Sequence, residues 1–202
     1  MSVVHIIDTL TNWARESVCK DIRLKVPPEN SEAMDSGYVY ELANPVAFPM
    51  YIPTKDKLPE GMFEHPSLCV RFISAQDDMS TKTGAMDVQI IFCVWDPGLH
   101  SEDVFQPNGD GSFRRQKAAE TEFERNGSGW RDVWNFVDLA VRKLESVSSI
   151  GAVTIDKATP VEYGPAKVDD AIADFYPYWC AELTFRATYP LMRNNEEYDK
   201  YL

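Results

Sequence analysis

The strongest constraint on the fold is a pair of long segments in which apolar and polar residues alternate. In residues 86–95 every even position from Met86 to Val94 is apolar, and the other side also becomes apolar towards Trp95. Residues 179–189 follow the same rule, with mostly polar side chains at the intervening positions. This alternation is typical of strands with one buried face. Both segments therefore predict long strands that line one side of a core.

Two other segments show helical periodicity. Apolar residues recur every three or four positions in residues 3–20 and, more regularly, in residues 130–144. Further strands are predicted at residues 68–74 and 153–163. The polar cluster between the first of these strands and residues 86–95 suits a hairpin connection, so these neighbours are expected to be antiparallel.

The resulting order is helix, strand, strand, helix, strand, strand, which does not alternate as a doubly wound parallel sheet would. We therefore predict an α+β fold, a two-layer sandwich in which two helices cover one face of a largely antiparallel four-stranded sheet. A length of 202 residues suits a single domain, residues 1–202.

Three embellishments of this domain are expected. Residues 22–66 contain seven prolines and predict an extended arm with at most edge strands, such as 38–42. Residues 99–129 predict an insertion with a short helix near 114–125. The polar residues 193–202 predict a loosely ordered tail.

The charge balance argues against nucleic-acid binding. With 32 acidic and 20 basic side chains the formal net charge is −12, which repels a phosphate backbone and offers no counterion release. The first residues lack the basic region of an export signal, and charges interrupt every apolar run, so neither export nor a membrane anchor is expected. Cys19, Cys69, Cys93 and Cys180 are widely spaced, and we interpret them as buried hydrophobic side chains in a reducing compartment.

Patterns that carry catalysis or metal binding are weak. Residues 108–113 resemble the centre of a calcium loop, but Gln106 and Lys117 stand where two carboxylate ligands belong. The densest group of potential metal ligands is in the loop from Asp96 to Asp103, which also holds His100 and Glu102. No nucleophile elbow or phosphate-binding glycine loop is present in the sequence. We predict no catalytic residue, no cofactor and no metal.

Contact with other protein chains is the better-supported expectation. A four-stranded sheet leaves two open edges, and apolar residues on the face without helices would be exposed in a monomer. Tyrosine and tryptophan are also enriched in protein interfaces. The interface candidates are Phe48, Met50, Tyr51, Ile52, Ile91, Trp95, Tyr176 and Tyr178.

Four segments together resemble a known family. They are residues 68–78, residues 86–96, Gly129-Trp130-Arg131-Asp132-Val133 with the helix after it, and Tyr176-Pro177-Tyr178-Trp179 with the strand after it. They are similar to tail-completion or tail-terminator-like proteins of tailed bacteriophages and prophages. The prolines of 22–66 and the insertion at 99–129 depart from a minimal member of that family.

The resemblance implies a small α/β structural protein without an active site. It implies a homo-oligomeric ring, commonly a hexamer, that caps the tail tube before the head joins, with tail-tube and neck proteins as partners. DNA would be passing, non-adherent cargo. The protein would lie in the host cytoplasm during assembly and in the virion tail afterwards.

Three alternatives stay open. The chain could be another neck or tail-tube component, or a module that binds a small molecule or a protein. The third is a metal-assisted hydrolase that uses the loop from Asp96 to Asp103.

Overall fold

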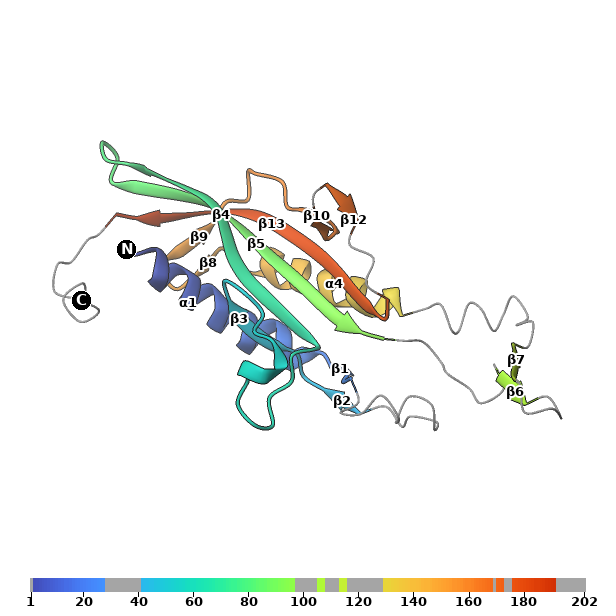
Figure 1. Ribbon diagram of the computed structural model, residues 1–202. Helices are drawn as coiled ribbons and strands as arrows, with labels where there is room; N and C mark the ends of the chain where they lie inside the picture. The colour runs from blue at the N-terminus through green and yellow to red at the C-terminus, as the bar shows by residue number, and fades with distance from the viewer. Residues whose placement is uncertain are drawn as a thin grey trace.

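The structure, a computed structural model, describes residues 2–27, 41–96, 105–107, 113–115, 129–168, 170–172 and 176–191. Its two longest strands, β5 (Thr83–Trp95) and β13 (Tyr178–Pro190), pair antiparallel over their whole length. They form the centre of a curled sheet with helices on one face (Figure 1). The predicted α+β class and the largely antiparallel pairing are therefore confirmed.

The expectation of four strands is wrong, because the sheet has seven. β4 (Ser67–Asp78) pairs with β5, and the short edge strand β3 (Val46–Pro49) runs parallel to β4. On the other side of β13 lie β9 (Val153–Ile155) and β10 (Glu162–Pro165), each paired with a different part of β13. β8 (Ser149–Ile150) pairs with β9.

Residues 153–163 form two strands rather than the predicted one because a turn interrupts them at Asp156. The Asp156 carboxylate accepts hydrogen bonds from the Ala158 N–H at 2.9 Å and from the Thr159 hydroxyl at 2.8 Å. Such local side-chain bonds offer the backbone an alternative to a strand ladder. The other two additional strands are β3, which comes from the proline-rich segment, and β8, which lies just before the predicted segment 153–163.

Among the described residues, three small strand pairs lie outside this sheet. β1 (Leu24–Lys25) pairs with β2 (Leu42–Ala43), β6 (Phe105–Pro107) with β7 (Phe113–Arg115), and β11 (Lys167–Val168) with β12 (Ala171–Ile172). Because β7 occupies 113–115, a helix cannot begin at 114 as predicted. The rest of that predicted helix, residues 38–40, residues 108–112 and the tail 193–202 lie outside the described residues.

The N-terminal helix is continuous but changes its winding. α1 (Val3–Trp13) begins at Ser2, whose hydroxyl accepts the His5 N–H at 3.2 Å as an N-cap. A π-helical turn, η1 (Ala14–Val18), and a 3-10 turn, η2 (Cys19–Asp21), continue it. A second 3-10 turn, η3 (Lys55–Lys57), lies between β3 and β4. The predicted apolar stripe is buried except for its first residue, Val3, which is 37% exposed. The buried residues are Ile6, Ile7, Leu10, Ala14 and Val18.

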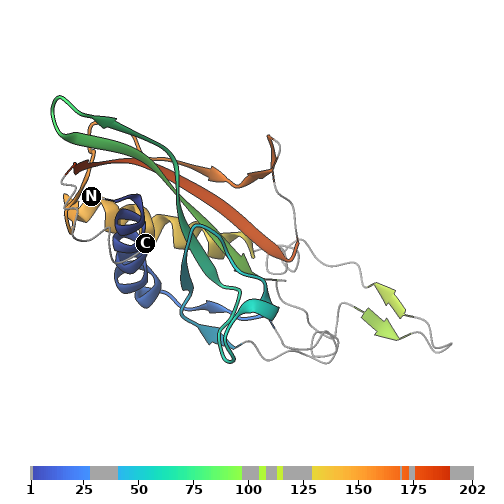
Figure 2. The same cartoon turned by 60° about the vertical axis from the view of Figure 1, so that its left-hand side comes forward.

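The second helix, α4 (Trp130–Ser146), buries Val133, Phe136, Val137, Ala140 and Leu144 at helical spacing. The Phe136 ring meets Phe92 of β5 edge to face, with ring centroids 4.9 Å apart. α1 packs against β3 and β4, whereas α4 packs against β5 and β13. Figure 2 shows both helices, blue and yellow, on the same side of the sheet. Within the described ranges, no helix is long and apolar enough to cross a membrane.

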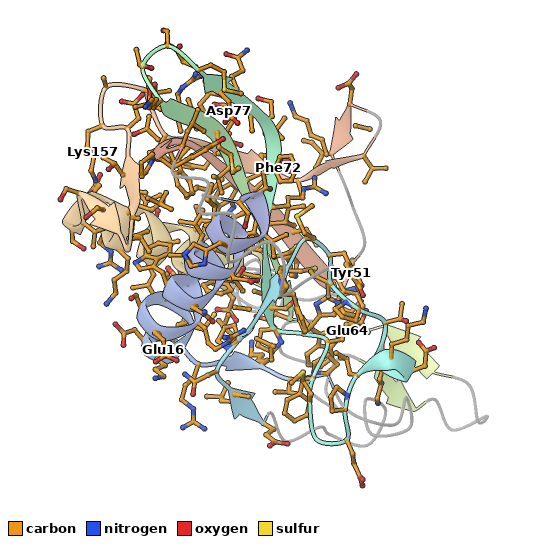
Figure 3. The ribbon with its side chains drawn as sticks, turned by 90° about the vertical axis from the view of Figure 1, so that its left-hand side faces the viewer. Glu16, Tyr51, Glu64, Phe72, Asp77 and Lys157 are labelled. Carbon is orange, nitrogen blue, oxygen red and sulfur yellow. The ribbon has the colours of Figure 1, made fainter. Side chains whose placement is uncertain are left out.

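A β-bulge divides β4 into two parts. The register with β5 shifts between Phe72 and Ser74, so that Ile73 is the extra residue and is exposed. Before the bulge β4 is mostly buried, and beyond it β4 is exposed. The β4–β5 hairpin therefore extends past the helices, with Asp77 on the projecting part (Figure 3).

Tyr189 of β13 contacts this hairpin near its turn. In the register Asp77, Gly84 and Tyr189 lie side by side on three adjacent strands. Gly84 has no side chain, so the Tyr189 ring lies across it, and a Cβ at this position would be 2.3 Å from the ring. The ring can then reach the next strand, where the Tyr189 hydroxyl donates to the Asp77 carboxylate at 2.9 Å.

Candidate interaction surfaces

The predicted anchors of the proline-rich segment are not all accessible. Phe48 in β3 is only 7% exposed, so the expectation that it could reach a neighbouring chain is wrong. Met50 follows β3 with a left-handed φ of 66°, while its N–H donates to the Val70 carbonyl at 2.8 Å. The backbone turns away from the sheet here, and Met50 and Tyr51 are exposed whereas Ile52 is half-buried. Figure 3 shows Tyr51 on the segment between β3 and β4.

The sheet face without helices is not an exposed apolar surface. Trp95 is 2% exposed, which contradicts the expectation that a monomer would leave it open, and Ile91 is half-buried. Tyr178, the register partner of Trp95, packs against His65 with ring centroids 5.0 Å apart. The segment before β4 therefore reaches this end of the face and contacts Tyr178.

Polar side chains occupy the middle of the same face. Gln89 accepts a hydrogen bond from Arg71 Nε at 2.6 Å and donates one to the Glu182 carboxylate at 3.0 Å. Further along, Asp87 accepts the Ser74 hydroxyl at 2.8 Å. These bonds satisfy the polar groups across three strands. Apolar contact with another chain is therefore expected at the ends of the sheet and not across its middle.

Exposed apolar side chains do lie at both ends of the sheet. Ile73 and Met79 are 57% and 68% exposed on the projecting hairpin. At the opposite end, Tyr176 and Trp130 are 58% and 44% exposed. The thirteen residues of β5 separate these ends, which corresponds to about 40 Å at 3.3 Å per residue. The two surfaces differ in composition, one aliphatic and the other aromatic.

The residues that flank segment 97–128 meet at a buried charge cluster. The Asp96 side chain is 3% exposed, and Lys25 Nζ lies 2.6 Å from its Oδ2 atom. The Trp179 indole donates to the Asp96 carbonyl at 2.9 Å, and a Cβ on Gly129 would be only 2.5 Å from that oxygen. Asp96 and Gly129, the residues on either side of segment 97–128, therefore lie next to each other.

Asp132, in the first turn of α4, belongs to the same cluster. Burial raises the pKa of the Asp132 carboxyl to about 6, with a further increase from the charge of Asp96, while Lys25 acts in the opposite direction. Burial and the neighbouring Asp96 carboxylate both favour the protonated form of Asp132. Asp132 is therefore the carboxyl that takes up a proton in mildly acidic solution.

The structure covers only part of the candidate hydrolase site. Asp96 forms an ion pair with Lys25, whereas His100, Glu102 and Asp103 lie outside the described residues. Within the described part of the chain, no group of three or more His, Cys, Asp or Glu side chains is arranged to hold a metal ion.

A groove of about 570 Å³ lies between η2 and α4. Asp21, Asp138, Glu145 and Arg142 are among its lining residues, together with Asn135 and three apolar side chains. The lining offers charges for ion pairing but no thiol, hydroxyl or imidazole nucleophile. It therefore gives no particular support to an enzymatic function.

Comparison with models of known protein families found no match, and comparison with curated proteins found none either. The function is therefore argued from the geometry. Sequence reasoning missed the Lys25–Asp96 pair and the projecting end of the β4–β5 hairpin. For the ion pair there was one signal in the sequence, because Asp96 directly follows a long apolar strand. Its partner Lys25, however, is far away in the sequence.

Proposed function

We propose that the chain is a non-enzymatic structural protein of a tailed bacteriophage virion, a ring-forming tail terminator or completion protein at the tail–neck junction. The support from sequence is the resemblance of four segments to that family. The support from structure is the pair of unlike apolar surfaces at opposite ends of the sheet.

Unlike surfaces at opposite ends suit a head-to-tail contact. When one patch binds a different patch on the next copy, the contact repeats until the rotation closes a ring. In this proposal the hairpin with Ile73 and Met79 meets the end of the neighbour that carries Tyr176 and Trp130. Met50 and Tyr51, with segment 97–128, supply further contacts to the neighbouring copy or to the tail tube.

The ring would act without a cofactor. Its copies would bind tail-tube and neck proteins, assemble in the host cytoplasm and remain in the virion tail. The same surfaces would serve another neck or tail-tube component, which is the closest alternative assignment.

Deletion of the gene in its phage, followed by electron microscopy of the lysate, tests the proposal. We expect free tails of uncontrolled length, or heads and tails that never join. Complementation with Tyr176→Asp should fail because a carboxylate in an apolar contact is costly to desolvate. Tyr163→Asp is the matched control, since Tyr163 is 55% exposed in the middle of the sheet edge. Normal infectious virions from the deletion strain would exclude the proposed function.

A further inference from the structure

Cys93 and Cys180 lie directly opposite each other on the two central strands. In an antiparallel pair of strands, hydrogen-bonded and non-hydrogen-bonded residue pairs alternate. The Asp96 N–H donates to the Pro177 carbonyl, and at the far end the Leu191 N–H donates to the Lys82 carbonyl. In the register of β5 with β13, these bonds join positions that lie opposite each other, 96 with 177 and 82 with 191. Since both positions on the β5 side are even-numbered, the even positions of β5 belong to hydrogen-bonded pairs. Cys93 and Cys180 are therefore a non-hydrogen-bonded pair.

In such pairs the Cα atoms are about 4.5 Å apart and the side chains approach closely. That separation is at the short end of the range that a disulfide accepts. Cys69 lies opposite Ile91, which is two positions from Cys93 along β5. Cys69 and Cys93 are therefore diagonal neighbours, and their Cα atoms are about 7 to 8 Å apart. Cys19 is buried among the helices on the other face. Of the four cysteines, Cys93 and Cys180 are therefore the two that can be joined.

The two thiols differ in accessibility and acidity. Cys180 is half-buried, whereas Cys93 is 7% exposed. A hydrogen bond from the Cys93 thiol lowers the pKa of Cys180, against the opposing effect of burial. The same hydrogen bond, together with burial, raises the pKa of Cys93. The thiol that reagents can reach is thus also the one that ionises first.

The titratable groups around the pair do not change which of the two thiols ionises first. Burial lowers the pKa of the adjacent His65 to about 4, so its imidazole is neutral at pH 7. Burial and, to a smaller extent, the charge of Glu64 raise the pKa of Tyr178, and Glu64 adds to the rise at Cys93.

We propose that Cys93 and Cys180 are a modification site at which a low-molecular-weight disulfide, such as oxidised glutathione, converts the pair to an intramolecular disulfide. The Cys180 thiolate attacks one sulfur of the reagent, whose S–S bond breaks and releases one thiolate that takes a proton from water. Cys93 then gives its proton to water and attacks the Cys180 sulfur, which releases the second small thiol. Two electrons pass from the cysteines to the reagent, which ends as two thiols.

The disulfide would join β5 and β13 beside the root of segment 97–128 and would close a loop of about 90 residues. Cross-links that close long loops restrict the unfolded chain strongly. The oxidised protein would therefore be more stable than the reduced protein. The proposal goes beyond the proposed function and does not depend on it, because both cysteines lie opposite each other within one chain.

The test starts with the full chain, which is purified with dithiothreitol and then equilibrated in a glutathione buffer that contains the oxidised form in excess. We expect a mass loss of two hydrogens, two alkylatable thiols in place of four after denaturation, and a peptide map that links Cys93 to Cys180. The melting temperature should rise by about 10 °C, and dithiothreitol should reverse the rise.

Variants separate this pair from general thiol oxidation. Cys69→Ala should still lose two thiols and gain the same thermal stability. Cys180→Ser should keep its three thiols, whereas Cys93→Ser should stop at a mixed disulfide with glutathione on Cys180. If the equilibrated wild type still has four titratable thiols, the proposal is overturned, whatever the variants show. A linkage between two chains, or one that includes Cys19 or Cys69, would also overturn it.

Discussion

Phe136 is the residue on which the contact between α4 and the sheet depends most. It is fully buried and meets Phe92 across the core. Phe136→Ala should reduce the free energy of unfolding by about 3 to 5 kcal/mol, because it removes apolar contacts and leaves a cavity. Urea denaturation measures this loss, with Val4→Ala, at a position 64% exposed, as the control. Equal stability of the two variants would mean that this interface is not packed as described.

Asp132 predicts a specific dependence of stability on pH. Its pKa is about 6 in the folded protein and near 4 in the unfolded chain, so folding favours its protonated form. The stabilising contribution is complete below about pH 4 and is lost as the pH rises through 6. Asp132→Asn should therefore stabilise the protein at pH 7.5 but have little effect at pH 4.5. The gain should be on the order of 1 kcal/mol, since solvent screens a group that is only partly buried.

Asp138→Asn, at an exposed position of the same helix, controls for the loss of one negative charge. Thermal melts of the wild type and both variants at the two pH values measure the difference. A gain for Asp132→Asn that is the same at pH 4.5 and pH 7.5 would contradict a raised pKa.

Individual core residues could be predicted from periodicity, whereas contacts between residues far apart in the sequence could not. Phe136 and Phe185 lie on the regular apolar faces of residues 130–144 and 179–189, and both are buried. Trp95 was expected to be exposed, because the sequence indicates the sheet face on which it lies but not the segments that cover this face. The Lys25–Asp96 pair was missed because nothing local specifies a contact between residues so distant in the sequence.

Among the elements, the projecting hairpin depends on Gly84. A Cβ there would be 2.3 Å from the Tyr189 ring, so Gly84→Ala must displace the ring and break its hydrogen bond to Asp77. Overpacking of this kind costs about 1 to 3 kcal/mol. Gly164→Ala is the matched strand control, because no atom lies within 4 Å of its added Cβ. Chemical denaturation should show a clear loss for the first variant alone; equal losses would contradict the close packing of Tyr189.

The long elements could be predicted, whereas of the short strands in the sheet only β9 and the start of β10 lie in a predicted segment, 153–163. β5, β13 and α4 each contain thirteen or more residues, so their periods repeat often enough to be recognised. The strands β3, β8, β9 and β10 contain two to four residues, too few for a pattern to repeat. Their pairing determines them: β3 with β4, β9 and β10 with β13, and β8 with β9. This is why four strands were expected and seven are present.

For the whole molecule, the net charge of −12 predicts that the protein does not bind duplex DNA. Carboxylates repel phosphates, and low salt strengthens whatever attraction exists, so a gel-shift assay at low salt is the most sensitive test. We expect no shift at micromolar protein. A shift at or below that concentration would contradict the idea of a channel surface along which DNA passes without adhering.

The meeting of Asp96 and Gly129 at one buried cluster has a consequence for how this chain could have evolved. Since the backbone leaves the sheet and returns to α4 at the same point, the intervening 32 residues could be lengthened, shortened or replaced by a brief connection without moving either element. Insertions with adjacent ends are tolerated because their closure costs little entropy. Descendants of one ancestral body could therefore carry unrelated loops here, and each lineage could match its own assembly partner while inheriting an unchanged core.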